Sequence, residues 1–390
     1  MNQLTKHLKG DQYLWAFISL LALFSFLPVY SASTNLIALY GNETLFKHLF
    51  KHAFSLILGF MIVFLTQLIK CRFFAIVSPF MLPPIIFLLL MSLVQAYVLD
   101  KSTARWIDIP FIGVSFQPST IAFPCLFIYC VRYLAKNKNK KISLRDSFIP
   151  LLTPIFIVVA LILPSNGSSA LMLFICVLFI LFIGGYPLKN IFIILSSFIF
   201  VVSLFVIIAL NIKNTSMHRA HTWKSRIERF FFLGKEKEES YQVKRAKAAI
   251  ILGKTLGKGP GKSAFKSILP QSFSDFIYAI IIEEYGLIGG VILIFVYLLI
   301  LLRFLIISTK LESYFESLLV LALGLPIILQ AFINMGVAVN LLPVTGQTLP
   351  LISAGGTSMW VVCFSLGVIL SASRSIKQEK KIDEANQIHP

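Results

Sequence analysis

Ten long apolar runs limit the folds that are open to this chain. A helix rises about 1.5 Å per residue, so a run of roughly 18 to 25 residues matches the hydrocarbon thickness of a bilayer. No run alternates between apolar and polar residues, as the strands of a membrane β-barrel do. Only 13% of the residues are charged, about half the share of an ordinary soluble domain. We therefore predict an all-α integral membrane protein that forms one polytopic domain over residues 1–390.

Each apolar run predicts one membrane-spanning helix. The third run contains Pro79, Pro83 and Pro84, which we expect to kink or shorten its helix. One large connection, residues 212–274, separates the seventh span from the eighth. The ten expected spans are residues 13–32, 49–69, 74–99, 118–135, 147–163, 168–186, 190–211, 274–302, 314–336 and 357–374.

Basic residues in the short connections indicate the orientation, because lysine and arginine accumulate on the cytoplasmic side. With the N-terminus in the cytoplasm, the short outer loops hold only Lys47, Lys51, Lys101 and Arg105. The inner connections hold more, including the run KNKNKKISLR at residues 136–145 and the tail at residues 375–390. We predict a multi-pass protein of the cytoplasmic (inner) membrane with both termini in the cytoplasm and the large loop outside.

The five cysteines all fall in or beside apolar runs. A disulfide framework would place them in an external loop instead. We therefore expect packing residues at Cys71, Cys125, Cys130, Cys176 and Cys363.

The large loop is strongly basic, with fourteen Lys and Arg residues against four Glu residues between positions 212 and 274. Such a surface favours an anionic partner, either a phosphate-bearing lipid headgroup or a polyanion outside the membrane. A solvated loop that touches acidic lipids without specificity is the alternative. Within the loop, Trp223, Ile227, Phe230 and Phe231 recur at helical spacing and predict an amphipathic helix on the outer membrane surface.

The glycine-rich segment GKTLGKGPGKS follows at residues 253–263. It is not a Walker loop, because that motif needs glycine at the position of Leu256. We expect a flexible turn whose amides, together with Lys258 and Lys262, face an anionic group. No feature of the chain indicates nucleic-acid binding.

A second irregular stretch, NLLPVTGQTLPLISAGGTS, occupies residues 340–358. Its prolines and glycines exclude a lipid-exposed helix, so this backbone must be buried in protein or line a wet cavity. It should form one wall of a site at the outer face. Gln330 and Asn334 lie one turn apart on the preceding span, where they could hydrogen-bond this wall or join two helices.

Three carboxylates accompany the eighth span, in the sequence LPQSFSDFIYAIIIEEYGLIGG from residue 269 to 290. Asp275 stands where the basic loop becomes an apolar helix, and Glu283 and Glu284 lie inside that helix. Ionisable groups at membrane depth are costly and usually functional. Asp275 could also be a simple N-cap.

Several of these motifs resemble one known family. LLPVTGQTLPLISAGGTS with FINMG before it, GKGPGKS followed by LPQSFSDFIYAIIIEEYGLIGG, and ARWIDI with FQPS at residues 104–119 are similar to the signatures of the SEDS proteins (shape, elongation, division and sporulation). The resemblance spans nearly the whole chain and includes the number of spans. Its motifs look most like those of the division (FtsW) branch, with the elongation (RodA) branch as the alternative. Two motifs depart from the family pattern: Thr120 stands where Glu is usual, and PSNGSSA at residues 164–170 replaces a PDxGTA-like stretch.

The resemblance implies a peptidoglycan glycosyltransferase, which joins lipid II molecules into β-1,4 glycan strands at the outer face of the membrane and releases undecaprenyl pyrophosphate. It also implies a class B penicillin-binding transpeptidase and other division proteins as partners. A lipid-linked precursor flippase or transporter, and a non-catalytic division scaffold, are the rival functions.

The resemblance implies Asp275 as the catalytic base, in the position of the family's SDF aspartate. Glu283 and Glu284 lie too far along the helix to act on the same sugar and are expected to be structural, as are Gln330 and Asn334. No metal-ligand cluster is visible, so a divalent cation, Mg or Mn, could only be shared with the substrate pyrophosphate. The candidate substrate-binding residues are Lys258, Lys262, Lys266, Arg105, Ser263, Thr345, Gln347 and Ser353.

Overall fold

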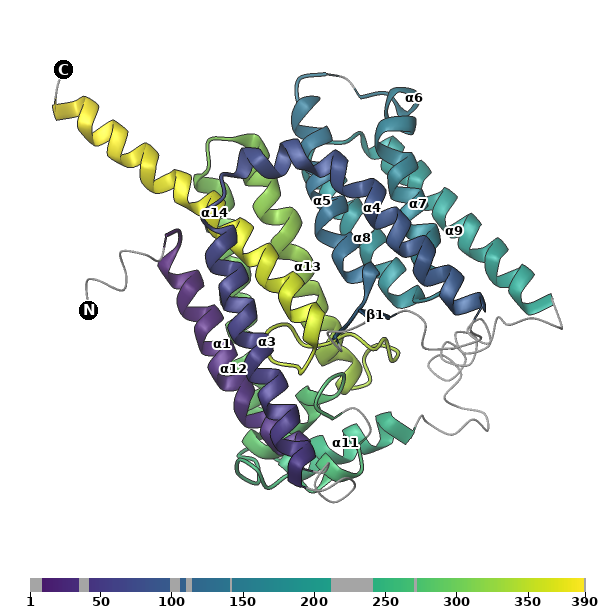
Figure 1. Ribbon diagram of the computed structural model, residues 1–390, viewed down its shortest axis with the longest axis vertical. Coiled ribbons are helices and arrows are strands. Elements are labelled where there is room, and N and C mark those ends of the chain that lie inside the picture. Colours follow the sequence, from purple (N-terminus) through teal and green to yellow (C-terminus); the bar gives the residue numbers. More distant parts are fainter. Residues whose placement is uncertain are drawn as a thin grey trace. The chain divides into compact units, whose positions relative to one another are not determined.

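The computed structural model describes residues 9–34, 42–98, 106–109, 114–140, 142–211, 241–269 and 272–388, and these are almost entirely helical (Figure 1). Arg105 and the amphipathic helix expected at residues 223–231 lie outside this part of the chain. The helices that match predicted spans are α1 (Gln12–Ser33), α3 (Asn42–Thr66), α4 (Cys71–Val98), α5 (Pro118–Lys136), α6 (Leu144–Ser147) continued by η2 (Phe148–Leu152) and α7 (Thr153–Ile162), α8 (Gly167–Ile183), α9 (Leu188–Asn211), α12 (Ile277–Lys310), α13 (Tyr314–Ala338) and α14 (Gly356–Ile388).

The described residues confirm the expected helical membrane architecture. Eight helical stretches are long and apolar enough to cross a bilayer, and two shorter apolar helices, Gly167–Ile183 and Leu188–Leu204, stand at the sixth and seventh predicted spans. The prolines of the third span do not shorten it, because α4 contains all three within 28 residues. All five cysteines are free and buried, as expected of packing residues.

Other elements are short and belong to the connections. Strands β1 (Ile107–Ile109) and β2 (Val114–Phe116) pair antiparallel before α5. Helix α11 (Tyr241–Gly253) and the short 3₁₀ helix η3 (Phe265–Ser267) belong to the large loop that precedes α12.

Local capping explains where α8 begins. The side chain of Asn166 accepts a hydrogen bond from the amide of Ser169 at 3.3 Å, so Asn166 is the N-cap. Asparagine is among the best N-cap residues because its oxygen satisfies an otherwise unpaired amide of the first turn. The PSNGSSA stretch, which departs from the family pattern, therefore has a clear structural role in starting a helix.

The chain forms two compact units. One unit contains residues 1–70, 229–311 and 324–390, and the other contains residues 71–228 and 312–323. Every feature of the candidate site described below belongs to the first unit.

Small residues allow α3 and α14 to pack closely within the first unit. A side chain at Gly59 would meet the sulfur of Cys363, and one at Gly367 would collide with Thr66. The indole of Trp360 donates to the carbonyl of Ser55 at 3.1 Å, which adds a hydrogen bond between the two helices. Close backbone approach and interhelical hydrogen bonds are the usual means of helix association in membranes.

An ion pair joins α1 to α12 at the end of this unit that is distant from the candidate site. Asp11 caps α1 by accepting from the amide of Leu14 at 2.8 Å, and its carboxylate also pairs with Arg303 of α12. The amide of Asp11 donates to the hydroxyl of Ser373 on α14 at 2.9 Å. Three helices therefore meet at one residue.

Candidate functional site

Helix α12 is sharply bent, which the sequence did not predict. Gly286 has φ 73° and ψ −178°, a conformation outside the helical region that only glycine adopts readily. The hydroxyl of Tyr278 donates to the carbonyl of Gly290 at 3.2 Å. In a straight helix these residues would be about 18 Å apart along the axis. Residues 277–285 therefore form a short helix that folds back against the start of the long one.

The glycine-rich loop fills the break in α12. The amides of Lys258 and Gly259 donate to the carbonyls of Glu283 and Glu284, at 3.0 and 2.9 Å. The amide of Leu287 donates in return to the carbonyl of Lys254 at 2.9 Å. The loop thus provides partners for the backbone groups that the bend deprives of their helical bonds.

Glycine is required where the loop meets the break. A side chain on Gly286 would collide with the carbonyl oxygen of Thr255, and one on Gly257 would collide with the carbonyl oxygen of Glu284. Gly257 also has a positive φ of 79°. Gly257 of the loop and Gly286 of α12 therefore allow the backbones of the two segments to pack directly against each other.

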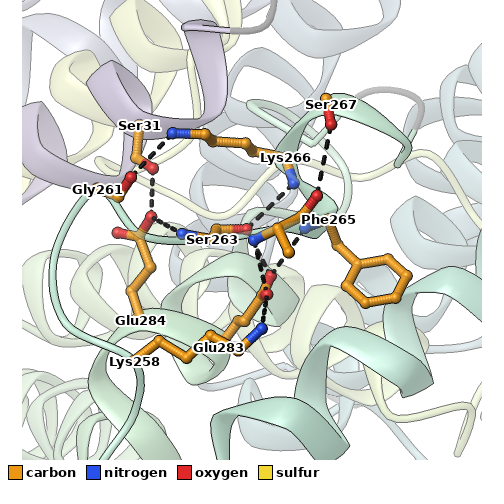
Figure 2. A network of polar contacts seen from close by, with 10 residues as sticks. Ser31, Lys258, Gly261, Ser263, Phe265, Lys266, Ser267, Glu283 and Glu284 are labelled. Atoms are coloured by element: carbon orange, nitrogen blue, oxygen red, sulfur yellow. Dashed lines mark hydrogen bonds and ion pairs between the residues drawn. The ribbon is translucent and has the colours of Figure 1, made fainter.

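Glu283 is the anionic group that the loop faces (Figure 2). Its carboxylate is fully buried and accepts from the amides of Ala264 and Phe265, at 2.8 and 3.3 Å. The hydroxyl of Ser263 donates to the same carboxylate, and the ammonium of Lys258 lies 3.1 Å away. A buried charge is tolerated when it is paired and hydrogen-bonded in this way.

Glu284 joins the same network to α1. Its carboxylate, 1% exposed, accepts from the hydroxyl of Ser31 and from the amide of Ser263 at 3.3 Å (Figure 2). Lys266 supports the turn by donating to the carbonyl of Gly261 at 2.8 Å. The two glutamates thus connect the loop, the bent helix and α1; their structural role stays a prediction.

Asp275 precedes the short helix and is half-buried. The N-cap position of α12 is Phe276, one residue after Asp275, and Phe276 makes no side-chain capping bond. The hydroxyl of Ser274 donates to its carboxylate at 2.8 Å. A Cβ on Gly346 would lie 3.6 Å from the other carboxylate oxygen, which places the 340–358 stretch directly beside this acid.

The 340–358 stretch is fastened to the segment that carries Asp275. The hydroxyl of Ser353 donates to the carbonyl of Ser274 at 2.7 Å, and the amide of Ala354 donates to the carbonyl of Phe273 at 3.0 Å. From α12, the hydroxyl of Tyr297 donates to the carbonyl of Pro350 at 2.5 Å. These bonds hold a non-helical backbone beside Asp275, as expected for one wall of a site.

Asn334 and Gln330 hold the wall from α13. The amide nitrogen of Asn334 donates to the carbonyls of Asp275 and Gln347, at 2.9 and 2.7 Å. The amide nitrogen of Gln330 donates to the carbonyl of Thr348 at 2.9 Å. Of the two roles left open for these amides, the structure supports attachment of the wall.

Two buried polar atoms near this attachment make no hydrogen bond within the described protein: Oδ1 of Asn334 and Oγ1 of Thr345. Buried polar atoms are normally paired with protein, water or ligand. Both residues adjoin segments that contact Asp275, because Thr345 precedes Gly346 in the chain. Each of these atoms therefore has unused hydrogen-bonding capacity close to Asp275.

The candidate substrate-binding residues fall into two groups. Thr345, Gln347 and Ser353 belong to the wall around Asp275, although Ser353 is buried and serves to fasten it. Lys258, Ser263 and Lys266 are engaged with Glu283 or with the loop itself. Lys262 is exposed on that loop. A substrate role for any of them, and for Arg105, stays a prediction.

The sequence analysis did not identify His48 of α3 as a neighbour of the site, or His52 as a buried residue one turn further along the same helix. The ring of His48 packs edge-on against Phe273, with centroids 4.9 Å apart, two residues before Asp275. His52 is buried and its Nε2 lies 3.0 Å from the hydroxyl of Ser25. Their spacing of four residues on one helix face was the available signal.

The described residues contain no group of three or more His, Cys, Asp or Glu side chains that could hold a metal ion. Asp275 could supply one oxygen ligand to a divalent cation, with substrate phosphates supplying others. The binding of a divalent cation therefore stays a prediction, because one carboxylate ligand from the protein neither requires a metal ion nor excludes it.

The fold and this arrangement define a class: a multi-pass helical membrane protein with a polar wall beside one acidic residue at the end of a bent span. A sequence model described as "Cell cycle protein" (FTSW_RODA_SPOVE) matches residues 11–378. The chain belongs to this FtsW/RodA/SpoVE family.

Named relatives cover most of the chain. "Probable peptidoglycan glycosyltransferase FtsW" from Enterococcus hirae is 30% identical over 383 residues, which is 94% of this chain and 93% of that protein. A protein with the same name from Nitrosococcus halophilus is 30% identical over 342 residues, covering 85% of this chain and 83% of its own length.

Solved structures share the fold. A chain from "Structural coordination of polymerization and crosslinking by a peptidoglycan synthase complex" has a TM-score of 0.71 and 21% identity, and the match covers 95% of this chain and 99% of that one. The crystal structure of Thermus thermophilus rod shape determining protein RodA has a TM-score of 0.60 and 22% identity, with coverage of 94% and 97%.

Proposed function

We propose that this protein is a peptidoglycan glycosyltransferase that polymerises lipid II at the outer face of the cytoplasmic membrane during cell division. The observation that carries the proposal is the setting of Asp275: a half-buried carboxylate beside an irregular wall that is fastened to its own backbone. The names of the relatives and the family of the chain support the same reaction class.

The proposed reaction joins two lipid-linked sugars. A hydroxyl oxygen of one sugar attacks the anomeric carbon of the other, and the bond from that carbon to the pyrophosphate oxygen breaks. Asp275 accepts the hydroxyl proton, and the lipid pyrophosphate leaves with the electron pair. A positioned carboxylate can act as such a general base when it lies within hydrogen-bonding reach of the hydroxyl.

The wall around Asp275 provides the polar groups that a sugar needs. Oγ1 of Thr345, in this wall, can donate or accept a hydrogen bond, and Oδ1 of Asn334, on α13 behind it, can accept one; both atoms are buried, so a sugar hydroxyl would reach them only after a local movement of the wall. Exposed Lys262 is the candidate to neutralise charge on a leaving pyrophosphate, because it lies on the basic loop and its side chain is exposed. We place this loop outside the cell and both termini in the cytoplasm.

A class B penicillin-binding transpeptidase is the proposed partner. The structural neighbour with the TM-score of 0.71 comes from a peptidoglycan synthase complex of polymerization and crosslinking, which supports such a pairing. The division role rests on the motif pattern and on the FtsW names of the relatives. An elongation role is the alternative within the same family.

Purified protein supplied with lipid II, alone and with a class B transpeptidase, tests the proposal. We expect glycan polymer on a gel, together with released undecaprenyl pyrophosphate. A parallel assay of lipid II movement across vesicle membranes tests the flippase alternative. Transport without any polymer, from a preparation that binds its partner, would overturn the transferase proposal.

A further inference from the structure

We propose that an apolar surface beside α11 rests on the outer surface of the bilayer, against anionic phospholipid headgroups. This surface, the interfacial patch, consists of Ile251, Leu252 and Leu256. The proposal uses the proposed function only in naming the outer side of the membrane. It concerns a helix and a turn that are not among the membrane spans.

Helix α11 has one face that is already occupied. Val243, Ala246, Ala249 and Gly253 are buried. A side chain at Gly253 would collide with the carbonyl oxygen of Ile282 in α12. This face therefore packs closely against the short bent helix and is not available to a ligand.

The interfacial patch projects away from that contact. Ile251 is 73% exposed, Leu252 41% and Leu256 78%. Three large aliphatic side chains within six residues would be unfavourable in water, because their apolar surface is removed from water only by a partner or by lipid. The described protein leaves them without such cover.

Main-chain hydrogen bonds place the interfacial patch next to lipid-facing residues. The amide of Leu287 donates to the carbonyl of Lys254 at 2.9 Å, and the amide of Ile288 donates to that of Thr255 at 3.3 Å. Leu287 and Ile288 are both exposed apolar residues at the start of the long part of α12. Leu256 follows Thr255 directly, so the interfacial patch continues the apolar surface that faces lipid.

The length of α12 indicates how deep in the membrane its bend lies. Residues 287–310 extend roughly 36 Å at about 1.5 Å per residue, enough to cross the hydrocarbon without the short helix. The bend at Gly286 therefore lies near one membrane surface. The interfacial patch lies beside this bend, and therefore at the depth of the headgroups, where amphipathic helices bind.

Charge complementarity favours an anionic bilayer over a neutral one. Residues 241–263 contain six basic residues and no acidic residue. Lys244, Lys254 and Lys262 are exposed in the same segment as the interfacial patch, and Tyr241 is an exposed aromatic residue at the start of α11. Apolar side chains flanked by lysine, with an aromatic residue nearby, are typical of segments bound at anionic membrane surfaces.

Spin labels on introduced cysteines test the proposal in bilayer nanodiscs that contain phosphatidylglycerol. Labels at Leu256→Cys and Ile251→Cys are compared with a lipid-facing reference, Val291→Cys, and an aqueous reference, Glu312→Cys, both at exposed positions. The native cysteines are buried, so labelling is directed to the introduced one. The readout is the accessibility of each label to oxygen, which enters lipid, relative to a water-soluble nickel chelate.

We expect the oxygen-to-nickel ratio at Leu256 and Ile251 to approach that at Val291 and to exceed that at Glu312. We also expect the ratio to fall in discs of neutral lipid. A ratio equal to that at Glu312 would overturn the proposal, and so would shielding that appears only after a transpeptidase is added. No step of this experiment depends on catalysis, so a failure of the proposed enzymatic activity would leave its result interpretable.

Discussion

At the residue scale, the main chain around Asp275 is fixed from three directions. Asn334 of α13 donates to the carbonyl of Asp275, Ser353 donates to that of Ser274, and the amide of Ala354 donates to that of Phe273. Catalysis by a general base depends on such placement, because an error of about 1 Å can cost roughly 100-fold in rate. Asn334 is therefore proposed as a positioning residue for Asp275.

Asn334→Asp should lower turnover of lipid II about 100-fold. The substitution keeps the shape of the side chain but removes the amide donor that joins the carbonyls of Asp275 and Gln347. Turnover and KM are measured separately, with thermal unfolding as a check on folding. A variant that unfolds normally and keeps full turnover would show that this attachment does not position the base.

At the element scale, the bend of α12 is a contact between two glycine-rich segments. Gly286 meets the backbone of the loop at Thr255, and Gly257 meets that of Glu284. The carboxylate of Glu283 accepts hydrogen bonds from amides of the loop and forms an ion pair with Lys258. The short helix that follows Asp275 depends on both features for its direction.

Gly286→Ala should destabilise the protein by about 1–3 kcal/mol from backbone strain alone, with a further cost from the collision at Thr255. Gly261→Ala is the matched control, because Gly261 has a similar positive φ of 76° but has open space where a Cβ would stand. Thermal unfolding in detergent measures both. Equal destabilisation of the two variants would mean that the collision contributes nothing.

Glu283→Ala should loosen the glycine-rich loop, because Ser263 and the amides of Ala264 and Phe265 lose their acceptor. Each buried donor left unpaired costs about 1–3 kcal/mol. Hydrogen–deuterium exchange should rise at residues 258–266. Glu312→Gln, at an exposed acid, is the control; unchanged exchange in the Glu283 variant would contradict a structural role for this carboxylate.

At the scale of the whole molecule, the proposed topology can be tested by labelling. Cysteines introduced at Lys262 and Lys140 occupy exposed positions in the large loop and in the basic connection before α6. A membrane-impermeant maleimide added to intact cells or spheroplasts should label Lys262→Cys, and Lys140→Cys only after lysis. The opposite pattern would reverse the orientation and place Asp275 on the cytoplasmic side.

The sequence predicted the spans well because each apolar run carries its own signal of length and hydropathy. The bend at Gly286 could not be predicted in this way, since a glycine inside an apolar run is also compatible with a straight helix. The sequence also could not identify the anionic group that faces the loop. This group is the carboxylate of Glu283, twenty residues further along the chain than Ser263. Such pairings follow from tertiary contacts, which composition and periodicity do not encode.

Asp275 is the residue on which the proposed function most depends. Its carboxylate is the acid beside the wall at residues 340–358, and loss of a general base lowers rates by about 100- to 10,000-fold. The matched control is Asp146→Asn, at an exposed acid of the other unit. Both variants should fold and insert as the unmodified protein does.

The most direct measurement is the rate of glycan polymer formation from lipid II by the unmodified protein, Asp275→Asn and Asp146→Asn, each with its transpeptidase partner. We predict polymer from the unmodified protein and from Asp146→Asn at similar rates, and a loss of about 100-fold or more for Asp275→Asn. Equal rates for all three would contradict the assignment of Asp275 as the catalytic base.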